Sequence, residues 1–216
     1  MSDEGRVWDC ALRVRDLLLA HAAQELRALC DPGFWDRSGE TELGTLAAHA
    51  TAVEMLGVLG HRSLLLAETP GAPEPRYAVE QQWTTGDAGN LAVEDERLFT
   101  LADRSAAEAS GDAERLARLG TKLAAQDAAA RYAELLQAGD AAGAAAMWTD
   151  AFREAHGAHV VPRIGSVRAA RLIAGVGPRT LVRCWFDEGE ETVELLWRET
   201  DRGRLIHGAR TFRPPA

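Results

Sequence analysis

Apolar residues in the first part of the chain follow a helical spacing. Between Val7 and Leu29 they recur every three or four positions, opposite charged residues, and this predicts an amphipathic helix over 7–29. The stretch 30–40, with one proline and two glycines, interrupts the pattern. A second helix is predicted over 42–59, ended by Gly60. The first half therefore begins with helices.

From residue 61 the pattern changes to short segments with β-branched and aromatic residues, separated by turns rich in proline and glycine. Three strands are predicted, in RSLLLAET, RYAVEQQWT and LAVEDERLFTL. A small, polar stretch without apolar periodicity follows, which is typical of a linker. We place this linker at 105–113, between a first domain over 1–104 and a second over 114–216.

The second half repeats the order of helices followed by strands. An alanine-rich helix is predicted over 114–137, then a break with the sequence AGD, then a helix that contains Met147 and Trp148. Asp140 is placed to cap that second helix, because its side chain can accept from exposed amide groups. Four strands are predicted in RAARLIAG, RTLVRCWF, TVELLWRE and RLIHGARTF.

Landmarks at similar spacing favour an internal duplication of the helix-then-strand unit. The matched landmarks are Trp35 with Trp148, Gly60 with Gly165, and Trp83 with Trp185.

The motif YAELLQAGDAAGAAAMWTDAFREAHG, over 132–157, and the hairpin VELLWRETDRGRLIHGARTF make the second half similar to the nuclear transport factor 2-like superfamily. The first half follows in outline, without a clear AGD break. The resemblance implies an α+β fold in which a curved antiparallel sheet wraps a helix, here in two tandem cone-like copies. It implies no reaction, because none of these motifs is catalytic.

The alternation of side chains along the strands indicates which faces of the sheets must be buried against other elements. In RTLVRCWF both faces are largely apolar, with Leu181 and Trp185 on one and Val182 and Phe186 on the other. A sheet that is apolar on both faces needs cover on both. Members of the resembled superfamily often dimerise sheet to sheet, so an intramolecular pseudo-dimer is expected.

The net charge and the cysteines indicate which classes of binding partner and metal site are disfavoured. A formal net charge of -9, from 33 acids against 24 bases, disfavours binding to nucleic acid. Three scattered cysteines favour neither a disulfide framework nor a thiolate zinc site. An acidic start and the lack of a long apolar run predict no membrane partner and a cytoplasmic location.

The resembled fold usually encloses a pocket, and the second half supplies candidates for its lining. Tyr132, on the inner helix, is the strongest indication of such a pocket. The full candidate set is Tyr132, Trp148, Arg183, Trp185, Glu194, Trp197, Arg198 and His207. An arginine, a carboxylate and a histidine beside tryptophan could bind an anion or carbonyl compound and shuttle a proton. Cross-strand ion pairing on a half-exposed face is the alternative for the charged members.

Other polar groupings are predicted to be structural. The spaced glutamates Glu68, Glu80, Glu94 and Glu96 of the first half are expected to lie at solvated strand edges. The sequence EAHGAH brings two histidines close to a glutamate, but its glycine argues against a helix and no distant third ligand is evident, so no metal is predicted. Phosphate loops, nucleophile elbows and dinucleotide fingerprints are missing from the sequence, and no cofactor is expected.

Two function classes stay open. The first is a non-catalytic module of the nuclear transport factor 2-like type, which binds a small apolar or anionic ligand or a protein partner. The alternative is a cofactor-independent enzyme, such as an isomerase, cyclase or dehydratase, that acts on a small apolar metabolite in the second-half pocket. The sequence assigns no catalytic residue.

Overall fold

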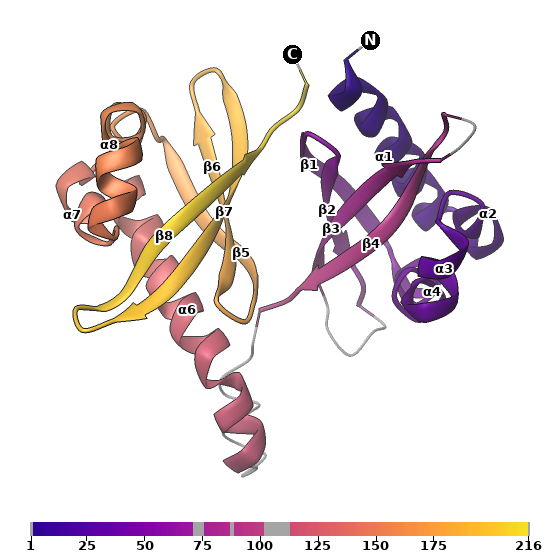
Figure 1. Ribbon diagram of the computed structural model, residues 1–216, viewed down its shortest axis with the longest axis horizontal. Helices are drawn as coiled ribbons and strands as arrows, with labels where there is room; N and C mark the ends of the chain where they lie inside the picture. The colour runs from indigo at the N-terminus through magenta and orange to yellow at the C-terminus, as the bar shows by residue number, and fades with distance from the viewer. Residues whose placement is uncertain (1, 71–75, 87–88, 102–112, 216) are drawn as a thin grey trace. The chain divides into compact units, whose positions relative to one another are not determined.

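The computed structural model describes residues 2–70, 76–86, 89–101 and 113–215, with side chains in the last range from residue 119. The chain forms two compact units, Met1–Thr100 with Phe212–Ala216, and Leu101–Thr211. Each unit contains helices and a four-stranded antiparallel sheet, which confirms the α+β class (Figure 1). The predicted linker lies outside the described residues, apart from residue 113 at the start of a helix.

The first unit begins with helices and ends with the sheet β1-β2-β3-β4. Its elements are α1 (Asp3–Leu19), α2 (Ala23–Arg27), α3 (Pro32–Phe34), the π-helical turn η1 (Trp35–Gly39), α4 (Glu40–His49), β1 (Ala52–Leu59), β2 (Arg62–Glu68), β3 (Arg76–Thr85) and β4 (Leu91–Phe99). The three predicted strands are confirmed as β2, β3 and β4.

Both helix predictions for the first unit were too long. The helix predicted over 7–29 ends at Leu19 and resumes as α2, and the helix predicted over 42–59 ends at His49, after which β1 pairs with β2. A short apolar run fits a buried strand or a helix equally well by periodicity alone. Pairing along β2 therefore decides the conformation of β1.

The second unit has the sheet order β5-β6-β7-β8. Its elements are α6 (Ala113–Gln137), α7 (Ala141–Ala146), α8 (Asp150–Ile164), β5 (Ala169–Val176), β6 (Arg179–Phe186), β7 (Gly189–Thr200) and β8 (Gly203–Phe212). The predicted long helix, the four strands and the cap are confirmed, since the Asp140 side chain accepts from the Gly143 N–H at 2.8 Å. Two details were wrong: Trp148 lies between α7 and α8, and α8 runs through Gly157.

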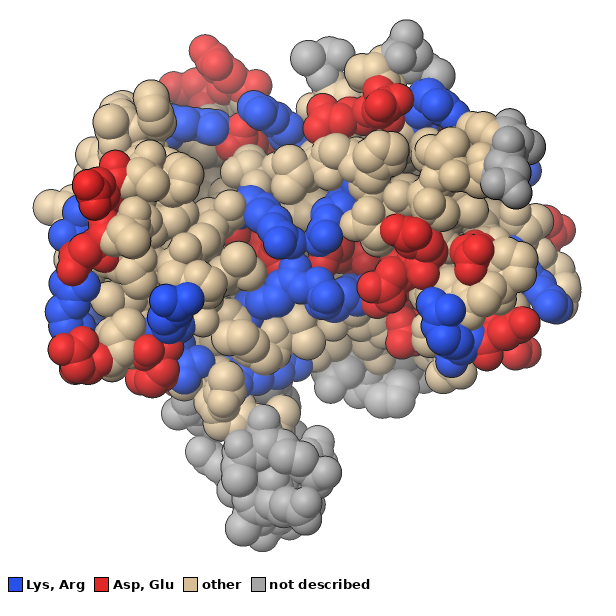
Figure 2. Space-filling model, in the orientation of Figure 1, with Lys and Arg blue, Asp and Glu red and all other residues tan. Residues whose placement is uncertain are grey.

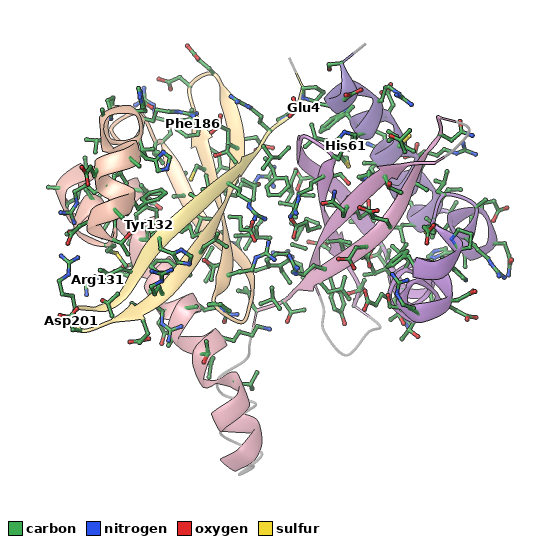
Figure 3. All side chains as sticks on the ribbon, in the orientation of Figure 1. Glu4, His61, Arg131, Tyr132, Phe186 and Asp201 are labelled. Atoms are coloured by element: carbon green, nitrogen blue, oxygen red, sulfur yellow. The ribbon has the colours of Figure 1, made fainter. Side chains whose placement is uncertain are left out.

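In each unit the helices lie on one face of the sheet and bury an apolar stripe against it (Figure 1). The buried residues of α1 are Val7, Ala11, Val14 and Leu18, and α6 buries Ala125, Ala129, Tyr132, Ala133 and Leu136. At the start of α1, the Glu4 carboxylate accepts from the Gly60 N–H at 2.9 Å and so holds the helix to the β1–β2 turn (Figure 3).

The turn after the first helix has the same geometry in both units. His21 and Gly139 both have positive φ, at 55° and 67°. The His21 N–H donates to the Leu18 carbonyl at 3.1 Å, and the Gly139 N–H donates to the Leu136 carbonyl at 3.0 Å. The AGD break of the second half thus has a structural counterpart in the first half, the sequence AHA at 20–22, which the sequence alone did not reveal.

The two sheets also share a bulge in their first strands. In β1 the register with β2 shifts between Met55 and Gly57, and in β5 the register with β6 shifts between Leu172 and Ala174. Each bulge stands at the same distance from its hairpin turn, so the strands of the two units can be matched residue by residue.

This matching corrects two of the landmark pairs. The Trp83 indole donates to the Ser63 hydroxyl at 2.8 Å, and the Trp197 indole donates to the Thr180 hydroxyl at 2.8 Å. Trp197 is therefore the counterpart of Trp83, because both lie on the third strand of their sheet, whereas Trp185 lies on the second. Gly60 likewise corresponds to Gly177, since both occupy the first hairpin turn with positive φ.

The third landmark pair changes for the same reason. Cys30 forms a parallel bridge with Val93 on β4, and Trp148 forms a parallel bridge with Ile206 on β8. Each of these residues directly precedes the helix cap that follows it, so Trp148 corresponds to Cys30 and not to Trp35.

The C-terminal segment Phe212–Ala216 belongs to the first unit, although it follows the second unit in the chain. Val58 on β1 and Arg213 exchange two backbone hydrogen bonds, of 2.9 and 3.3 Å. Gly57, with φ 152°, allows this approach, because a Cβ there would lie 2.3 Å from the Arg213 nitrogen. The matching position of the second unit holds Ala174, which does not share the positive φ of Gly57.

We expect Gly57→Ala to lower the free energy of unfolding of the first unit by about 2–3 kcal/mol, since both the positive φ and the backbone overlap oppose a Cβ. Urea denaturation measures the change. Gly44→Ala in α4 is the control: a Cβ there meets nothing within 4 Å, so stability should stay the same or rise. Equal stability of Gly57→Ala and the unmodified protein would contradict the close approach.

Acidic and basic side chains are interspersed on the visible face of each unit (Figure 2). Several form exposed ion pairs, such as Arg168 with Asp187 at 2.7 Å. Within the described ranges, no helix is both long and apolar enough to cross a membrane.

Candidate functional site

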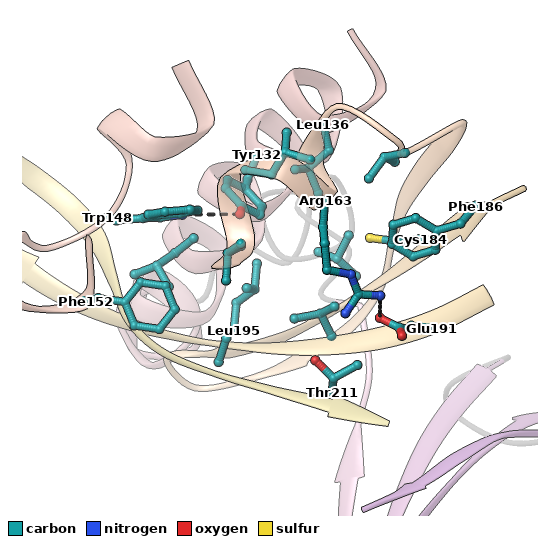
Figure 4. Close-up of a pocket in the computed structure, with 17 residues that line it drawn as sticks. Tyr132, Leu136, Trp148, Phe152, Arg163, Cys184, Phe186, Glu191, Leu195 and Thr211 are labelled. Carbon is teal, nitrogen blue, oxygen red and sulfur yellow. Dashed lines mark hydrogen bonds and ion pairs between the residues drawn. The ribbon is translucent and has the colours of Figure 1, made fainter. Parts of the chain in front are cut away.

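The second unit encloses a pocket between α6, α8 and the inner face of its sheet (Figure 4). Its cavity volume is about 120 Å³. Its wall consists mainly of aliphatic and aromatic side chains, including Leu136, Phe152, Val182, Phe186 and Leu195. Apolar cavities of roughly this size, about 150 Å³, can stay dry and bind a molecule such as benzene.

The deep wall of the pocket carries one polar pair, Tyr132 and Trp148. The Trp148 indole N–H donates to the Tyr132 hydroxyl at 3.2 Å (Figure 4). Tyr132 is 6% exposed and Trp148 is fully buried. The ring of Trp197 meets the Tyr132 ring edge-on, with 6.5 Å between centroids, and supports it from behind.

Local structure fixes the position of Trp148. The Thr149 N–H donates to the Ile206 carbonyl at 2.9 Å, and the Thr149 hydroxyl caps α8 by accepting from the Phe152 N–H at 3.3 Å. The Phe152 ring then meets the Trp148 ring edge-on at 5.5 Å. The indole is thus held between β8 and the first turn of α8.

Two ionisable side chains that line the pocket, Tyr132 and Cys184, have a raised pKa, which favours their neutral forms. Burial raises the pKa of Tyr132 to about 12, although the hydrogen bond from Trp148 opposes the shift. Burial also raises the pKa of the Cys184 thiol to about 12, helped by the negative charge of Glu191. A thiol with so high a pKa is a poor nucleophile, because the thiolate is the reactive form.

An ion pair stands at one end of the pocket. Arg163, from the last turn of α8, contacts Glu191 at 2.7 Å, and its guanidinium lies 5.2 Å from the centroid of the Phe186 ring (Figure 4). The Arg163 side chain is 52% exposed, whereas that of Glu191 is 12% exposed. Arg163 therefore marks the side of the pocket that reaches solvent.

Three of the eight candidate residues from the sequence lie on the helix side of the sheet. Tyr132 and Trp148 line the pocket, and Trp197 packs behind Tyr132. The alternation along β6 was interpreted correctly, but the pocket lies on its apolar face, with Val182 and Cys184, and not on the face that carries arginine.

The other five candidates line no part of this pocket. Arg183 and Trp185 alternate with the pocket-lining residues of β6; Arg183 pairs with Glu190 at 2.5 Å and lies 5.2 Å from the Trp185 ring. Glu194 alternates with Leu195 on β7; it is buried and forms an ion pair with Arg179.

Arg198 and His207 are exposed. Partial burial and the charge of Arg198 lower the pKa of His207. The proton shuttle suggested from the sequence needs an arginine, a carboxylate and a histidine in one pocket. The candidate side chains for these roles do not line the pocket that contains Tyr132.

Sequence reasoning missed Arg163, Glu191 and Cys184 as pocket residues. Glu191 shares a face with Val193 and Leu195, and an acid on an otherwise apolar strand face was an available signal. Arg163 had no such signal, because its position depends on α8 running through Gly157.

The interior of the first unit differs at the matching positions. Val14 stands where the second unit has Tyr132, and Cys30 stands where it has Trp148. In place of the pocket wall on β8, β4 presents Glu96, whose Oε2 accepts from the Gln81 side chain at 3.4 Å. Within the described part of the chain, the buried Glu96 Oε1 has no hydrogen-bond partner.

Two glutamates predicted at solvated strand edges are therefore withdrawn from solvent: Glu80 is buried, and Glu96 is half-buried with an inaccessible Oε1. Glu80 is 4% exposed and pairs with Arg62 at 2.6 Å and Arg97 at 3.0 Å. Burial raises the pKa of Glu96 to about 8, and the nearby carboxylates Glu42 and Asp95 add to the shift.

The residues described contain no group of three or more side chains that could hold a metal ion. Of the two histidines in EAHGAH, His156 packs on the Phe152 ring, with 4.8 Å between ring centroids. The chain matches no protein-family model, and no curated protein matches it.

Proposed function

We propose that the second unit binds a small, largely apolar molecule in the pocket between α6, α8 and its sheet, and does not convert it chemically. The observation that carries the proposal is the apolar cavity itself, closed at its deep end by the Tyr132–Trp148 pair. Concave apolar cavities with a few converging polar groups are the usual form of small-molecule sites.

The state of the lining groups favours binding over catalysis. Acid and base catalysts work best with a pKa near the working pH. Tyr132 and Cys184 both have a pKa raised to about 12, far above that range. Glu191 is engaged by Arg163 at the solvent side, so its charge is already balanced.

A titration with ethylbenzene, followed by the NMR signal of the Trp148 indole N–H, tests this proposal. The unmodified protein should show saturable binding. Ala209→Phe, at an exposed pocket-lining position on β8, should abolish it by filling the cavity. The matched control is Ala151→Phe, at an exposed position of α8 away from the pocket lining, and it should bind normally. Binding that survives Ala209→Phe would contradict this location.

We also propose that the two units are tandem copies of a nuclear transport factor 2-like cone. The shared turn after the first helix, the shared bulge and the matched Trp83 and Trp197 contacts support a duplication. In this scheme the second copy binds the ligand, while the first has lost the tyrosine and tryptophan of the pocket. The sheet-to-sheet pseudo-dimer and the cytoplasmic location stay predictions.

A further inference from the structure

The hydrogen bond between Trp148 and Tyr132 has a fixed direction. An indole N–H is a donor and has no acceptor atom, so the Tyr132 oxygen must be the acceptor of this bond. The hydroxyl proton of Tyr132 is therefore free to point elsewhere. Its oxygen lies at the deep wall of the pocket (Figure 4).

Among the described residues, the Tyr132 hydroxyl forms one hydrogen bond, the one it accepts from Trp148. Its proton therefore has no acceptor among these residues. The side chain is nonetheless only 6% exposed. Leaving a buried donor unpaired is unfavourable, because the donor has lost its hydrogen bond to water without gaining another. A ligand that supplies an acceptor at this point removes that cost, and one that lacks an acceptor does not.

The rest of the wall limits which acceptor fits. An alcohol would bring its own proton into a wall made mainly of aliphatic and aromatic side chains, where it would need a second acceptor. An ammonium has no lone pair to offer Tyr132. A carboxylate would be desolvated without a free cation to pair with in the pocket lining, because the lining arginine, Arg163, already pairs with Glu191.

We infer that the ligand of the second unit is a small uncharged carbonyl compound, whose oxygen accepts from the Tyr132 hydroxyl while its apolar part fills the remaining cavity. This inference rests on the proposed function, since it specifies the ligand class of the same pocket. The donated bond gains strength from the Trp148 N–H behind it, because hydrogen bonds in a chain polarise one another.

Matched probes of similar size test the inference. Acetophenone and ethylbenzene share a phenyl ring and differ in the carbonyl oxygen, and benzoate adds a negative charge. In the unmodified protein, acetophenone should bind about two- to tenfold more tightly than ethylbenzene, the range expected for one net hydrogen bond. Benzoate should bind more weakly than either.

Tyr132→Phe should bring the two affinities together while ethylbenzene still binds. Trp148→Phe lacks the indole signal, so its binding is followed by the methyl signals of Leu136 and Val182 in the pocket lining. It should keep a smaller preference for acetophenone, because Tyr132 can still donate. Tyr77→Phe, at the other tyrosine of the chain, is the matched control and should leave the preference unchanged.

The outcomes separate the two proposals. If none of the probes binds, the proposed function fails. If ethylbenzene and acetophenone bind the unmodified protein equally, or if Tyr132→Phe keeps the preference, the pocket exists and the carbonyl inference is overturned. A bound water that serves as the acceptor for Tyr132 would give the equal-affinity result.

Discussion

Replacing Glu96 with glutamine should raise the stability of the first unit at pH 8 by up to about 4 kcal/mol and leave it nearly unchanged at pH 5. The folded first unit holds the Glu96 carboxyl with a pKa of about 8, against 4.5 for an ordinary glutamate. Between these two values the folded chain binds a proton that the unfolded chain has lost. Stability of the unmodified protein should therefore fall as pH rises, by roughly 1.4 kcal/mol per pH unit.

The structural cause lies in the surroundings of the Glu96 carboxyl. It is desolvated, it faces the carboxylates of Glu42 and Asp95, and it receives one long hydrogen bond from Gln81. Gln81 is in turn fixed by the Ser63 hydroxyl, which donates to it at 3.2 Å. A neutral amide at position 96 keeps the shape of the protonated acid and has no charge to bury.

Hydrogen–deuterium exchange of β3 and β4 peptides in urea, at several pH values between 5.5 and 8.5, measures this effect for the first unit alone. Glu25→Gln, which alters an exposed acid of α2, is the control and should follow the unmodified protein. A pH slope that persists in Glu96→Gln would assign the slope to another group.

Removing either matched tryptophan should be the most damaging change to its own unit. Trp83→Ala and Trp197→Ala should each cost about 3–5 kcal/mol, because each ring is 3% exposed or less and each indole is hydrogen-bonded. Hydrogen exchange should increase in β1–β4 for the first variant and in β5–β8 for the second. Only Trp197→Ala should also abolish ethylbenzene binding, since Trp197 supports Tyr132.

Trp185→Ala tests whether Trp197 or Trp185 is the counterpart of Trp83, as the structure and the sequence landmarks respectively indicate. Trp185 is half-buried and its ring contacts the Arg183 guanidinium, so its removal should cost less than removal of Trp197. If Trp197→Ala does not fold, Thr180→Val provides a milder test, because it removes only the acceptor of the Trp197 indole. A larger loss for Trp185→Ala than for Trp197→Ala would refute the matching.

The strands and the long helix could be predicted because their patterns are local. RTLVRCWF and TVELLWRE are rich in β-branched and aromatic residues, and 114–137 is rich in helix-forming alanine. β1 could not be predicted, since a run of apolar residues in 52–59 carries no period that separates a strand from a helix.

The pocket could be predicted only in part. Tyr132 was found because the resembled fold places its position on the helix that the sheet wraps, where a side chain can point into the pocket. Arg163 and Glu191 meet only after α8 and β7 pack together, and no spacing along the chain records that contact. Glu96 was misjudged because the bulge between Gln82 and Trp83 changes which face each residue of β4 presents.

The pairing of Arg213 with Val58 bears on the order in which the protein folds during synthesis. The ribosome synthesises the whole second unit before it adds Arg213. Until then, the edge of β1 that pairs with Arg213 has no partner. Open strand edges are sites of aberrant pairing between chains. The first unit to be translated is thus the last to be finished, and the newly made chain is most prone to aggregate in that interval.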